Sequence, residues 1–434
     1  MIKTKKLILL WLAIFSSATL FAQPTIMPAD TQAHTIIIRN ATIHVGNGQV
    51  IEKGTVTFTH GIIDFVGTGS PSENAADAVE IDASGKHVYP GFIAPNTTLG
   101  LVEFSSVRAS VDFAETGENN AHVRSLIAYN TDSKVINTLR SNGILLAQVT
   151  PQRGLISGQS SVVQLDAWNW EDAAYATDDG LHVNWPEWRV PRSGNLRGIE
   201  KQRNAVNERI DAFQEYLLKA KAYLELDKPE TINARFEAFR GIFSGSKRLF
   251  VHANEATGIL TAVNTLKPLG ITPVIVGGRE ANLVLSLLKE NKVPVIIRDS
   301  HALPSSVDED VNAPYKQAKV LYDAGILAAY SIDGFWQQRN LPFIAGTAVA
   351  FGLDKEAALQ FITLNTAKIL GIDKRTGSLE AGKEANLFIS DGDALDMRTN
   401  KVEAAFIQGR QIDLDNLHKQ LFERYKTRYH MSED

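Results

Sequence analysis

The sequence predicts an α/β protein whose central part has the length of an eight-stranded (β/α)8 barrel. Strand candidates alternate with helical stretches between residues 88 and 375, as a parallel sheet requires. β-rich segments flank this region on both sides. The central region is close to the ~250 residues typical of such a barrel. Alternation alone fits an open doubly wound sheet equally well, so the residues themselves leave both architectures open.

The N-terminus has the pattern of an export signal. Lys3, Lys5 and Lys6 precede an apolar stretch over residues 7–15. This stretch is short for a membrane span, which needs ~20 residues. We therefore expect residues 1–22 to be a signal peptide cleaved after Ala22, and the protein to be periplasmic or secreted. A retained membrane anchor is the alternative.

The composition narrows the function further. The chain has 44 Lys and Arg against 49 Asp and Glu, a formal charge of −5, which argues against a general nucleic-acid or anionic-membrane surface. It has no Cys, so neither a disulfide nor a lipid-modified Cys can form. Its hydrophobic fraction of 44% is ample for a large core.

The two β-rich ends are expected to meet. Short β-branched runs and the turn Asn47-Gly48 predict an N-terminal meander, which cannot bury both of its faces alone. Near the other end, a turn from Thr376 leads into an apolar strand, and further strands follow over residues 402–407 and 410–412. We therefore expect the two ends to form one composite domain.

The central region contains seven readable strands. They are Val88–Ala94, Ile144–Val149, Ser161–Leu165, Leu249–His252, Thr272–Val276, Val293–Ile297 and Ile326–Tyr330. An eighth strand between residues 166 and 240 cannot be located. Helices are expected over Ser133–Ser141, Glu200–Leu226, Ile232–Arg240, Ile259–Leu266 and Arg279–Glu290, with an amphipathic helix over residues 415–430.

Two long segments, residues 102–128 and 166–199, are expected to be loops at the mouth of the barrel. Loops of this length in a compact domain are usually functional or disordered, and the density of Trp and Pro in the second segment favours order. A packing flap that touches no ligand is the alternative.

The start of the central region resembles the first barrel strand of the amidohydrolase superfamily. Pro90-Gly-Phe-Ile93 matches the Pro-Gly-apolar-Ile of that family, in which Asp-x-His-x-His follows and the two His bind a metal. Here Asn96 and Thr98 stand at the two His positions. Residues 377–393 also resemble the family's Gly-Ser-Leu-Glu-x-Gly-Lys-x-Ala-Asp-Leu segment. Imidazolonepropionase-like members are the most similar.

This resemblance decides between the two architectures. It implies a (β/α)8 TIM-type barrel beside a small β-sandwich built from both termini. The expected boundaries are 1–22 for the signal peptide, 34–87 with 376–412 for the sandwich, 88–375 for the barrel, and 413–434 for the C-terminal helix and tail.

The resemblance also assigns roles to two residues at strand ends, where barrels place their sites. His252 corresponds to the fifth-strand metal ligand. Asp333 corresponds to the carboxylate that takes a proton from the metal-bound water and passes it to the leaving nitrogen. From the residues alone, a lone His after a strand is more often structural, and Asp333 could be a loop or N-cap carboxylate.

Other ligand positions of the family are substituted. Gly278 stands near the sixth-strand His position, and the pair Gly277-Gly278 favours a tight turn over an anion site because no full phosphate-binding motif surrounds it. Asn96 and Thr98 offer neutral oxygens that hold zinc weakly. His122 and His182, expected in the long loops, and His301, after the seventh strand, are further candidate donors. Arg279 and His301 are also possible substrate contacts.

A catalytic zinc site typically needs three protein ligands, and only two of the family's set remain. The expected cofactor is therefore none, or one divalent zinc-like metal. We expect an exported amidohydrolase-like protein in which hydrolysis of non-peptide C–N bonds in small amides or cyclic amides is weakened. The alternative is a non-catalytic small-molecule-binding protein, or the silent subunit of an intact paralogue. Expected partners are a small molecule and a homo- or hetero-oligomeric copy, without nucleic acid or stable membrane insertion.

Overall fold

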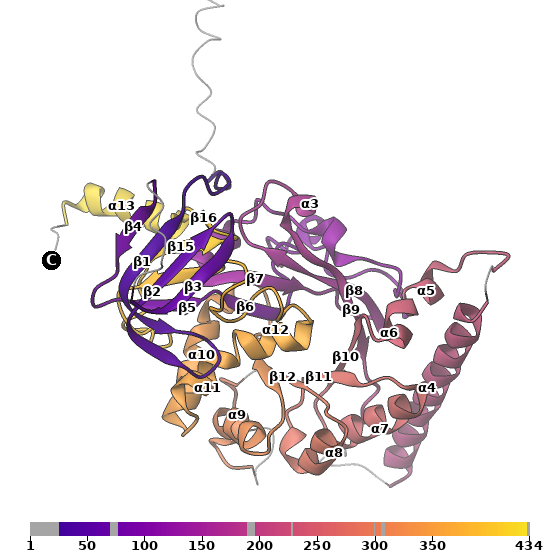
Figure 1. Ribbon diagram of the computed structural model, residues 1–434. Coiled ribbons are helices and arrows are strands. Elements are labelled where there is room, and N and C mark those ends of the chain that lie inside the picture. The colour runs from indigo at the N-terminus through magenta and orange to yellow at the C-terminus, as the bar shows by residue number, and fades with distance from the viewer. Residues whose placement is uncertain are drawn as a thin grey trace, which may run out of the picture.

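The computed structural model describes residues 26–69, 77–188, 196–226, 229–298, 300–304 and 309–431. The expected signal peptide and its cleavage point lie outside these residues. The described chain forms two eight-stranded sheets, one from its two ends and one from its middle (Figure 1). No helix among the described residues combines the length and apolar character needed to cross a bilayer.

The first sheet joins the two ends of the chain. Its strands are β1 (Ile36–His44), β2 (Val50–Thr59), β3 (Ile62–Thr68), β4 (Val79–Asp82), β5 (His87–Pro90), β14 (Leu387–Ser390), β15 (Val402–Ile407) and β16 (Arg410–Gln411). The junction is an antiparallel pairing of β5 with β14, in which Tyr89 lies opposite Phe388. Figure 1 shows the indigo N-terminal strands beside the yellow C-terminal ones. The composite sheet is thus observed, whereas its division into the two layers of a sandwich stays a prediction.

The second sheet is the barrel. Its strands, in spatial order, are β13 (Ala328–Tyr330), β12 (Val295–Ile297), β11 (Pro273–Gly277), β10 (Arg248–Ala253), β9 (Ala174–Asn184), β8 (Ile156–Gln164), β7 (Ile144–Val149) and β6 (Phe92–Thr97). No direct pairing of β13 with β6 is recorded among these described strands, but one segment bridges them. Tyr330 N donates to Phe361 O, at 3.1 Å, and Ile93 N donates to Ile362 O, at 2.9 Å. The barrel is therefore nearly closed.

Helices cover the outside of the barrel. They are α2 (Lys134–Arg140), α3 (Trp170–Ala173), α4 (Leu196–Leu224), α5 (Ala234–Glu237), α6 (Arg240–Ser244), α7 (Ala256–Leu266), α8 (Leu285–Glu290), α9 (Ala313–Asp323), α10 (Leu341–Ala350), α11 (Lys355–Gln360) and α12 (Leu364–Leu370). Short 3-10 turns are η1 (Arg108–Ser110), η2 (Ser125–Ala128), η3 (Lys267–Leu269), η4 (Ala281–Val284) and η5 (Gln337–Asn340). The last helix, α13 (Leu417–Tyr429), has no buried side chain and contacts α2. Figure 1 shows it near the C-terminus of the chain.

One barrel strand runs against the others. β8 is antiparallel to both β7 and β9, whereas all other neighbours in this sheet are parallel. The reason is the connection between β7 and β8, residues 150–155, because a parallel crossover needs a dozen or more residues and a hairpin does not. The expected regular (β/α)8 barrel is therefore corrected to a TIM-like barrel with one reversed strand.

The predicted first strand, Val88–Ala94, is also corrected. It is two strands, β5 in the first sheet and β6 in the barrel, and the chain changes sheet at Gly91. A Cβ at Gly91 would lie 2.7 Å from Leu145 Cδ1, so any larger residue would have to displace the Leu145 side chain of β7. The apolar run looked continuous because both strands are buried.

The segment over residues 166–199 is not the long loop that was expected. It contains α3, the eleven-residue strand β9 and the start of α4. β9 is the barrel strand that could not be located, because Thr177, Asp178, Asp179 and Gly180 interrupt its apolar pattern. Residues 102–128, in contrast, form a long loop with only the short turns η1 and η2.

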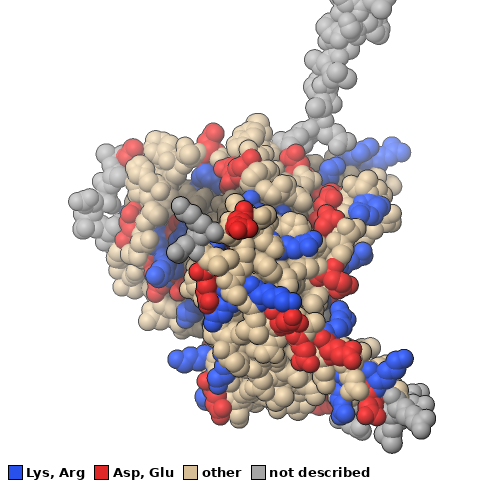
Figure 2. All heavy atoms as spheres, turned by 90° about the vertical axis from the view of Figure 1, so that its right-hand side faces the viewer, with Lys and Arg blue, Asp and Glu red and all other residues tan. Residues whose placement is uncertain are grey.

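The charged surface is mixed in sign. Figure 2 shows Lys and Arg side chains interspersed with Asp and Glu on the face that carries α4 and its neighbours. No single-sign field dominates this face, which agrees with the small net charge of −5.

Candidate active site at the mouth of the barrel

Asp333 lies in the loop that follows β13, at the carboxyl end of the barrel strands. Thr97 Oγ1 donates to Gly334 O at 3.1 Å, and this bond fastens the loop to the end of β6. The Asp333 side chain is half exposed, at 48%. Its carboxylate accepts a hydrogen bond from a terminal guanidinium nitrogen of Arg298, in a close ion pair. The proton-handling residue of the family pattern is thus paired with a cation.

Arg298 is the first residue after β12. Ile297 pairs with Tyr330, and Ser331 N donates to Ile297 O at 2.8 Å, so the strand register brings residue 298 beside the loop of Asp333. The Arg298 side chain is 24% exposed, and its Nε is buried without a hydrogen-bond partner among the described residues. Sequence reasoning did not single out Arg298. Its position in the sequence could have identified it, because Arg298 is the first charged residue after an apolar strand. Barrels carry their active sites at that end of the strands.

His252, at the end of β10, is hydrogen-bonded to a second histidine. His182 Nδ1 and His252 Nε2 lie 2.9 Å apart. Burial lowers the pKa of both rings, to about 3 for His252, where the positive charge of Arg298 lowers it further. Both rings are therefore neutral at pH 7, and one must donate to the other.

The tautomers follow from the surroundings. His182 Nε2 is buried with no hydrogen-bond partner among the described atoms. Leaving an unprotonated nitrogen there costs less than burying an unpaired N–H, so the proton of His182 belongs on Nδ1. We infer that His182 Nδ1–H donates to His252 Nε2. The lone pair of His252 Nε2 is then already engaged.

His182 was expected in a loop, and this is corrected. It lies in β9, fully buried, with its ring stacked on Phe250 at a centroid distance of 4.6 Å. His122, in contrast, lies in the long loop after β6, as expected. The His182–His252 pair was not foreseen because its partners are 70 residues apart and the strand that carries one of them was not readable.

Asn96 and Thr98, at the family's His-x-His positions, are both buried at the end of β6. Asn96 adopts a left-handed backbone with φ of 52°, which Asn tolerates better than most residues. Its Nδ2 lies 3.5 Å from Ser331 Oγ, and its Oδ1 is buried without a partner in the described part of the chain. Thr98 lines the same cleft as Asp333 and Arg298.

Gly278 forms a tight turn, as the sequence favoured. Its φ is 59°, and its amide donates to Ala253 O at 2.8 Å, so the N–H is not available to an anion. The two residues expected as possible substrate contacts, Arg279 and His301, have partners within the protein. Arg279 pairs with Glu255, and His301 Nε2 lies 2.8 Å from Thr347 Oγ1. Neither lines the cleft described next, and their role as substrate contacts stays a prediction.

A cleft of about 530 Å³ opens at this end of the barrel. The loop after β6 forms one wall, with Val102, Ser105, Ser106, Arg108, Val111, Phe113 and Ala114. Its other lining residues are Thr98, Gln152, Arg153, Arg298, Asp333, Gly334 and Phe335. The expectation that residues 102–128 border the mouth of the barrel is confirmed for this stretch. Three arginines and one carboxylate give the cleft an excess of positive charge.

A buried polar network lies inside the barrel, joined to the end of β6. Asn96 N donates to Gln148 Oε1 at 3.0 Å, and Gln148 Nε2 donates to Asp179 Oδ2 at 2.6 Å. Ser160 Oγ donates to the other oxygen of Asp179 at 2.8 Å. Burial raises the pKa of Asp179 to about 6, against the opposing effect of these hydrogen bonds. Sequence reasoning missed this network because its members stand on four different strands.

The donor set does not fit a catalytic divalent metal. Across the described ranges, no group of three or more His, Asp or Glu side chains is placed to hold a metal ion. Asp333 is paired with a guanidinium, and His252 Nε2 with His182. The other ligand positions of the family carry the amide of Asn96 and the hydroxyl of Thr98, and Gly278 offers no side-chain donor. A firmly held zinc typically needs three N, S or carboxylate ligands.

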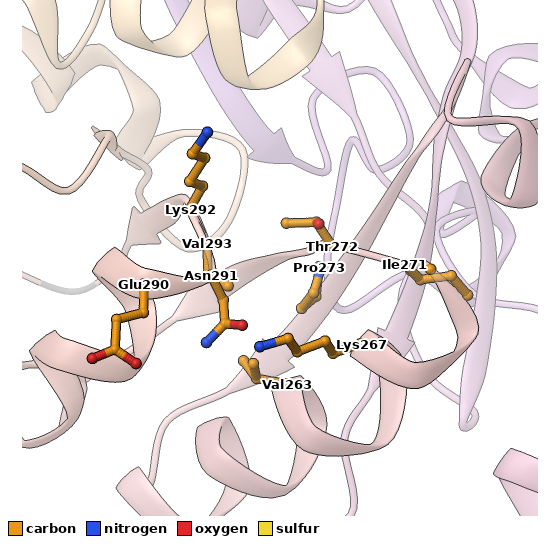
Figure 3. A pocket seen from close by; sticks show the side chains of 10 residues that line it. Val263, Lys267, Ile271, Thr272, Pro273, Glu290, Asn291, Lys292 and Val293 are labelled. Carbon is orange, nitrogen blue, oxygen red and sulfur yellow. The ribbon is translucent and has the colours of Figure 1, made fainter.

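A second hollow, of about 300 Å³, lies at the opposite end of β11. Figure 3 shows Lys267, the first residue of η3, and Asn291, after α8, facing one another across it. It lies at the amino ends of the barrel strands, where residues generally serve stability and not chemistry. The cleft beside Asp333 is therefore the candidate active site.

Comparisons with known proteins agree with this architecture. Residues 220–412 match the sequence profile of the Amidohydrolase family. The chain is 24% identical to the imidazolonepropionase of Geobacillus sp. (strain WCH70) over 378 residues, which cover 79% of this chain and 84% of the relative. It is 23% identical to the 5-methylthioadenosine/S-adenosylhomocysteine deaminase of Moorella thermoacetica, over 82% of this chain and 85% of the relative.

Among solved structures, an amidohydrolase from Thermotoga maritima MSB8 superposes with a TM-score of 0.75 at 24% sequence identity. The match covers 87% of this chain and 99% of that one, which supports the TIM-like barrel fold. Together, the family profile, the sequence relatives and the solved structure support the amidohydrolase superfamily for this chain. Within it, the chain is imidazolonepropionase-like, as its sequence relatives show.

Proposed function

We propose that this protein binds a small molecule at the mouth of its barrel and that metal-dependent hydrolysis of non-peptide C–N bonds is weakened or lost in it. Superfamily membership supports C–N bonds of small molecules as the ancestral target. The observation that carries the proposed weakening is the donor set: an amide at Asn96, a hydroxyl at Thr98, and an Asp333 already paired with Arg298.

The cleft supports the small-molecule part of the proposal. Its volume of about 530 Å³ is within the range of ligand pockets, and it combines aromatic walls with a few polar groups. Phe113 and Phe335 offer apolar surface, whereas Arg108, Arg153 and Arg298 offer charged donors. A ligand that carries a carboxylate or another anionic group beside an amide suits this lining.

The same proposal has three further parts. The protein is exported, and its two ends form a composite β-sandwich domain. It also assembles with a second copy or with an intact paralogue. The export pattern of residues 1–22 supports a periplasmic or secreted protein. The exposed apolar side chains of α13, Leu421, Phe422 and Tyr425, support a contact with another subunit.

Binding and hydrolysis can be measured separately. We expect calorimetric titration with a panel of carboxylate-bearing amides and cyclic amides to detect binding without added metal. Arg153→Ala should weaken that binding by about tenfold or more, since it removes a charged donor from the cleft. Arg424→Ala, on the exposed α13, is the matched control and should bind as the wild type does.

The same panel tests the loss of hydrolysis. We expect cleavage close to the uncatalysed rate, with or without added zinc. Zinc-dependent turnover that disappears in Asp333→Asn would contradict the proposal. If no member of the panel binds in the cleft, the proposal that the protein binds a small molecule there is contradicted.

A further inference from the structure

We propose that the guanidinium of Arg298 is a resident cation that takes the place of the metal ion beside Asp333 and excludes a divalent metal from the pocket. This inference rests on the proposed loss of metal-dependent hydrolysis at the same site. It goes beyond that loss by naming the group that replaces the metal. Two separate changes are involved. Asn96 and Thr98 replace the family's metal ligands, and the guanidinium of Arg298 occupies the space of the metal. Each change can be tested by itself.

The position of Arg298 supports the proposal in two ways. Its guanidinium binds Asp333, which the superfamily pattern places next to the metal. It lines the same cleft as Thr98, which stands at the second position of the His-x-His pair. One cation therefore binds the residue at the last-strand position and shares a cleft with a residue at the first-strand ligand positions.

The backbone holds this cation in place. β12 is fully buried, and its pairing with β13 fixes residue 298 beside the loop that carries Asp333. Three quarters of the side-chain surface of Arg298 is covered, since 24% is exposed. A guanidinium stays protonated at all accessible pH values, so the positive charge is permanent. The arrangement is a built feature of the strand ends and not a chance surface contact.

The charge explains why a metal would be excluded. A divalent cation in this space would be repelled by the guanidinium and would have to displace it from Asp333. Asp333 would in turn lose a charge-assisted hydrogen bond. Both effects oppose metal binding, even if the missing ligands were restored.

Restoring the ligands is therefore the test. We expect Asn96→His/Thr98→His to bind zinc weakly in calorimetric titration, because Arg298 remains. Adding Arg298→Ala should tighten zinc binding by more than about tenfold, because it removes a like charge beside the ion and frees the carboxylate of Asp333 to bind it. Asn96→His/Thr98→His/Arg298→Lys keeps the positive charge and is the matched control, which should stay weak. Thermal unfolding of each variant confirms that it is folded.

Two results would overturn the inference. If Asn96→His/Thr98→His already binds zinc as tightly as the triple variant, Arg298 does not exclude the metal. If the Arg298→Ala triple variant also fails to bind, removing the guanidinium does not open the site. Either result leaves the proposed function intact, since that depends on ligand binding and turnover by the unmodified protein.

A milder change gives a second readout. Asp333→Asn removes the counter-charge and leaves the guanidinium of Arg298 in the cleft. Sulfate should then raise the Tm of this variant more than that of the wild type, because an anion can replace the lost carboxylate. Equal shifts in the two proteins would show that the partly buried guanidinium of Arg298 does not need a counter-charge.

Discussion

At the scale of single residues, polar side chains inside the barrel are hydrogen-bonded to one another, and few of them carry a charge. His182 and His252 are both neutral, and the proton between them fixes the orientation of both rings. Asp179 is the ionisable carboxyl of the neighbouring network, and it accepts from Gln148 and Ser160. Because burial opposes its charge, Asp179 makes the stability of the barrel sensitive to pH.

The pKa of Asp179 is raised to about 6 from an ordinary 3.8. Between these values the folded protein holds a proton that the unfolded chain releases, so the free energy of unfolding falls as the pH rises from about 4 to 6. The expected loss is about 3 kcal/mol, from 1.36 kcal/mol per pKa unit. Urea unfolding at pH 4.5 and 7 should detect about 2 kcal/mol of this loss in the wild type, because part of it has already occurred at pH 4.5, and Asp179→Asn should remove it.

The comparison with wild type isolates the contribution of Asp179, because other groups titrate equally in both proteins. Asp323→Asn, an exposed change on α9, is the control and should keep the wild-type pH dependence. A pH dependence in Asp179→Asn equal to that of the wild type would contradict the assignment.

The sequence located some site residues and not others, for a physical reason. Asn96, Thr98, His252 and Asp333 stand near the ends of strands that short apolar patterns reveal. Their chemistry, however, depends on Arg298 and His182, which meet them only through strand register. A period-2 or apolar run identifies a strand, but it does not show which side chains converge across neighbouring strands.

At the scale of elements, turns determine the departures from a regular barrel. The short connection after β7 reverses β8, and Gly91 passes the chain from one sheet to the other. The turn at residues 376–382 is a third such element, because it leads the chain from the barrel helices back to the first sheet. One of the two motifs that resemble the family, residues 377–393, begins in this turn. Its glycines Gly377 and Gly382 are packed differently.

Gly377 and Gly382 test that turn. Both have a positive φ, of 94° and 86°, but a Cβ at Gly377 would lie 2.6 Å from Ala367 Cβ, whereas one at Gly382 meets nothing within 4 Å. Gly382→Ala should cost about 1–2 kcal/mol from backbone strain alone. Gly377→Ala should cost roughly 3 kcal/mol or more, since overpacking adds to the strain.

Chemical denaturation of the two variants measures this difference. The backbone contribution is shared, so the excess in Gly377→Ala reports the contact with α12. Equal losses of stability would show that the neighbouring helix moves to make room.

At the scale of the whole molecule, the two sheets form a single structure that neither end of the chain can complete alone. β5 is hydrogen-bonded to both β1 and β14, and the barrel follows it after one residue. Tyr89 of β5 and Phe388 of β14 belong to the same hydrophobic core as the barrel strands. The large-scale fold was predictable, because both ends carried clear β patterns and a matching turn motif.

This continuity predicts cooperative unfolding. The strands of the first sheet contain no Trp, so Trp fluorescence reports on the barrel, whereas far-UV circular dichroism reports on both sheets. We expect the two signals to change with the same midpoint in urea. Separate midpoints would show that the first sheet unfolds independently of the barrel.

The pairing of β5 with β14 also constrains how the protein can be made. Its partners are about 300 residues apart, from Pro90 to Leu387, so the pairing is among the most non-local contacts of the chain. While the chain emerges in order, β5 has an open edge until β14, at residues 387–390 of 434, has been released. Unpaired edges of this kind template aggregation. A nascent chain would therefore benefit from a chaperone that covers the early strands until the late ones arrive.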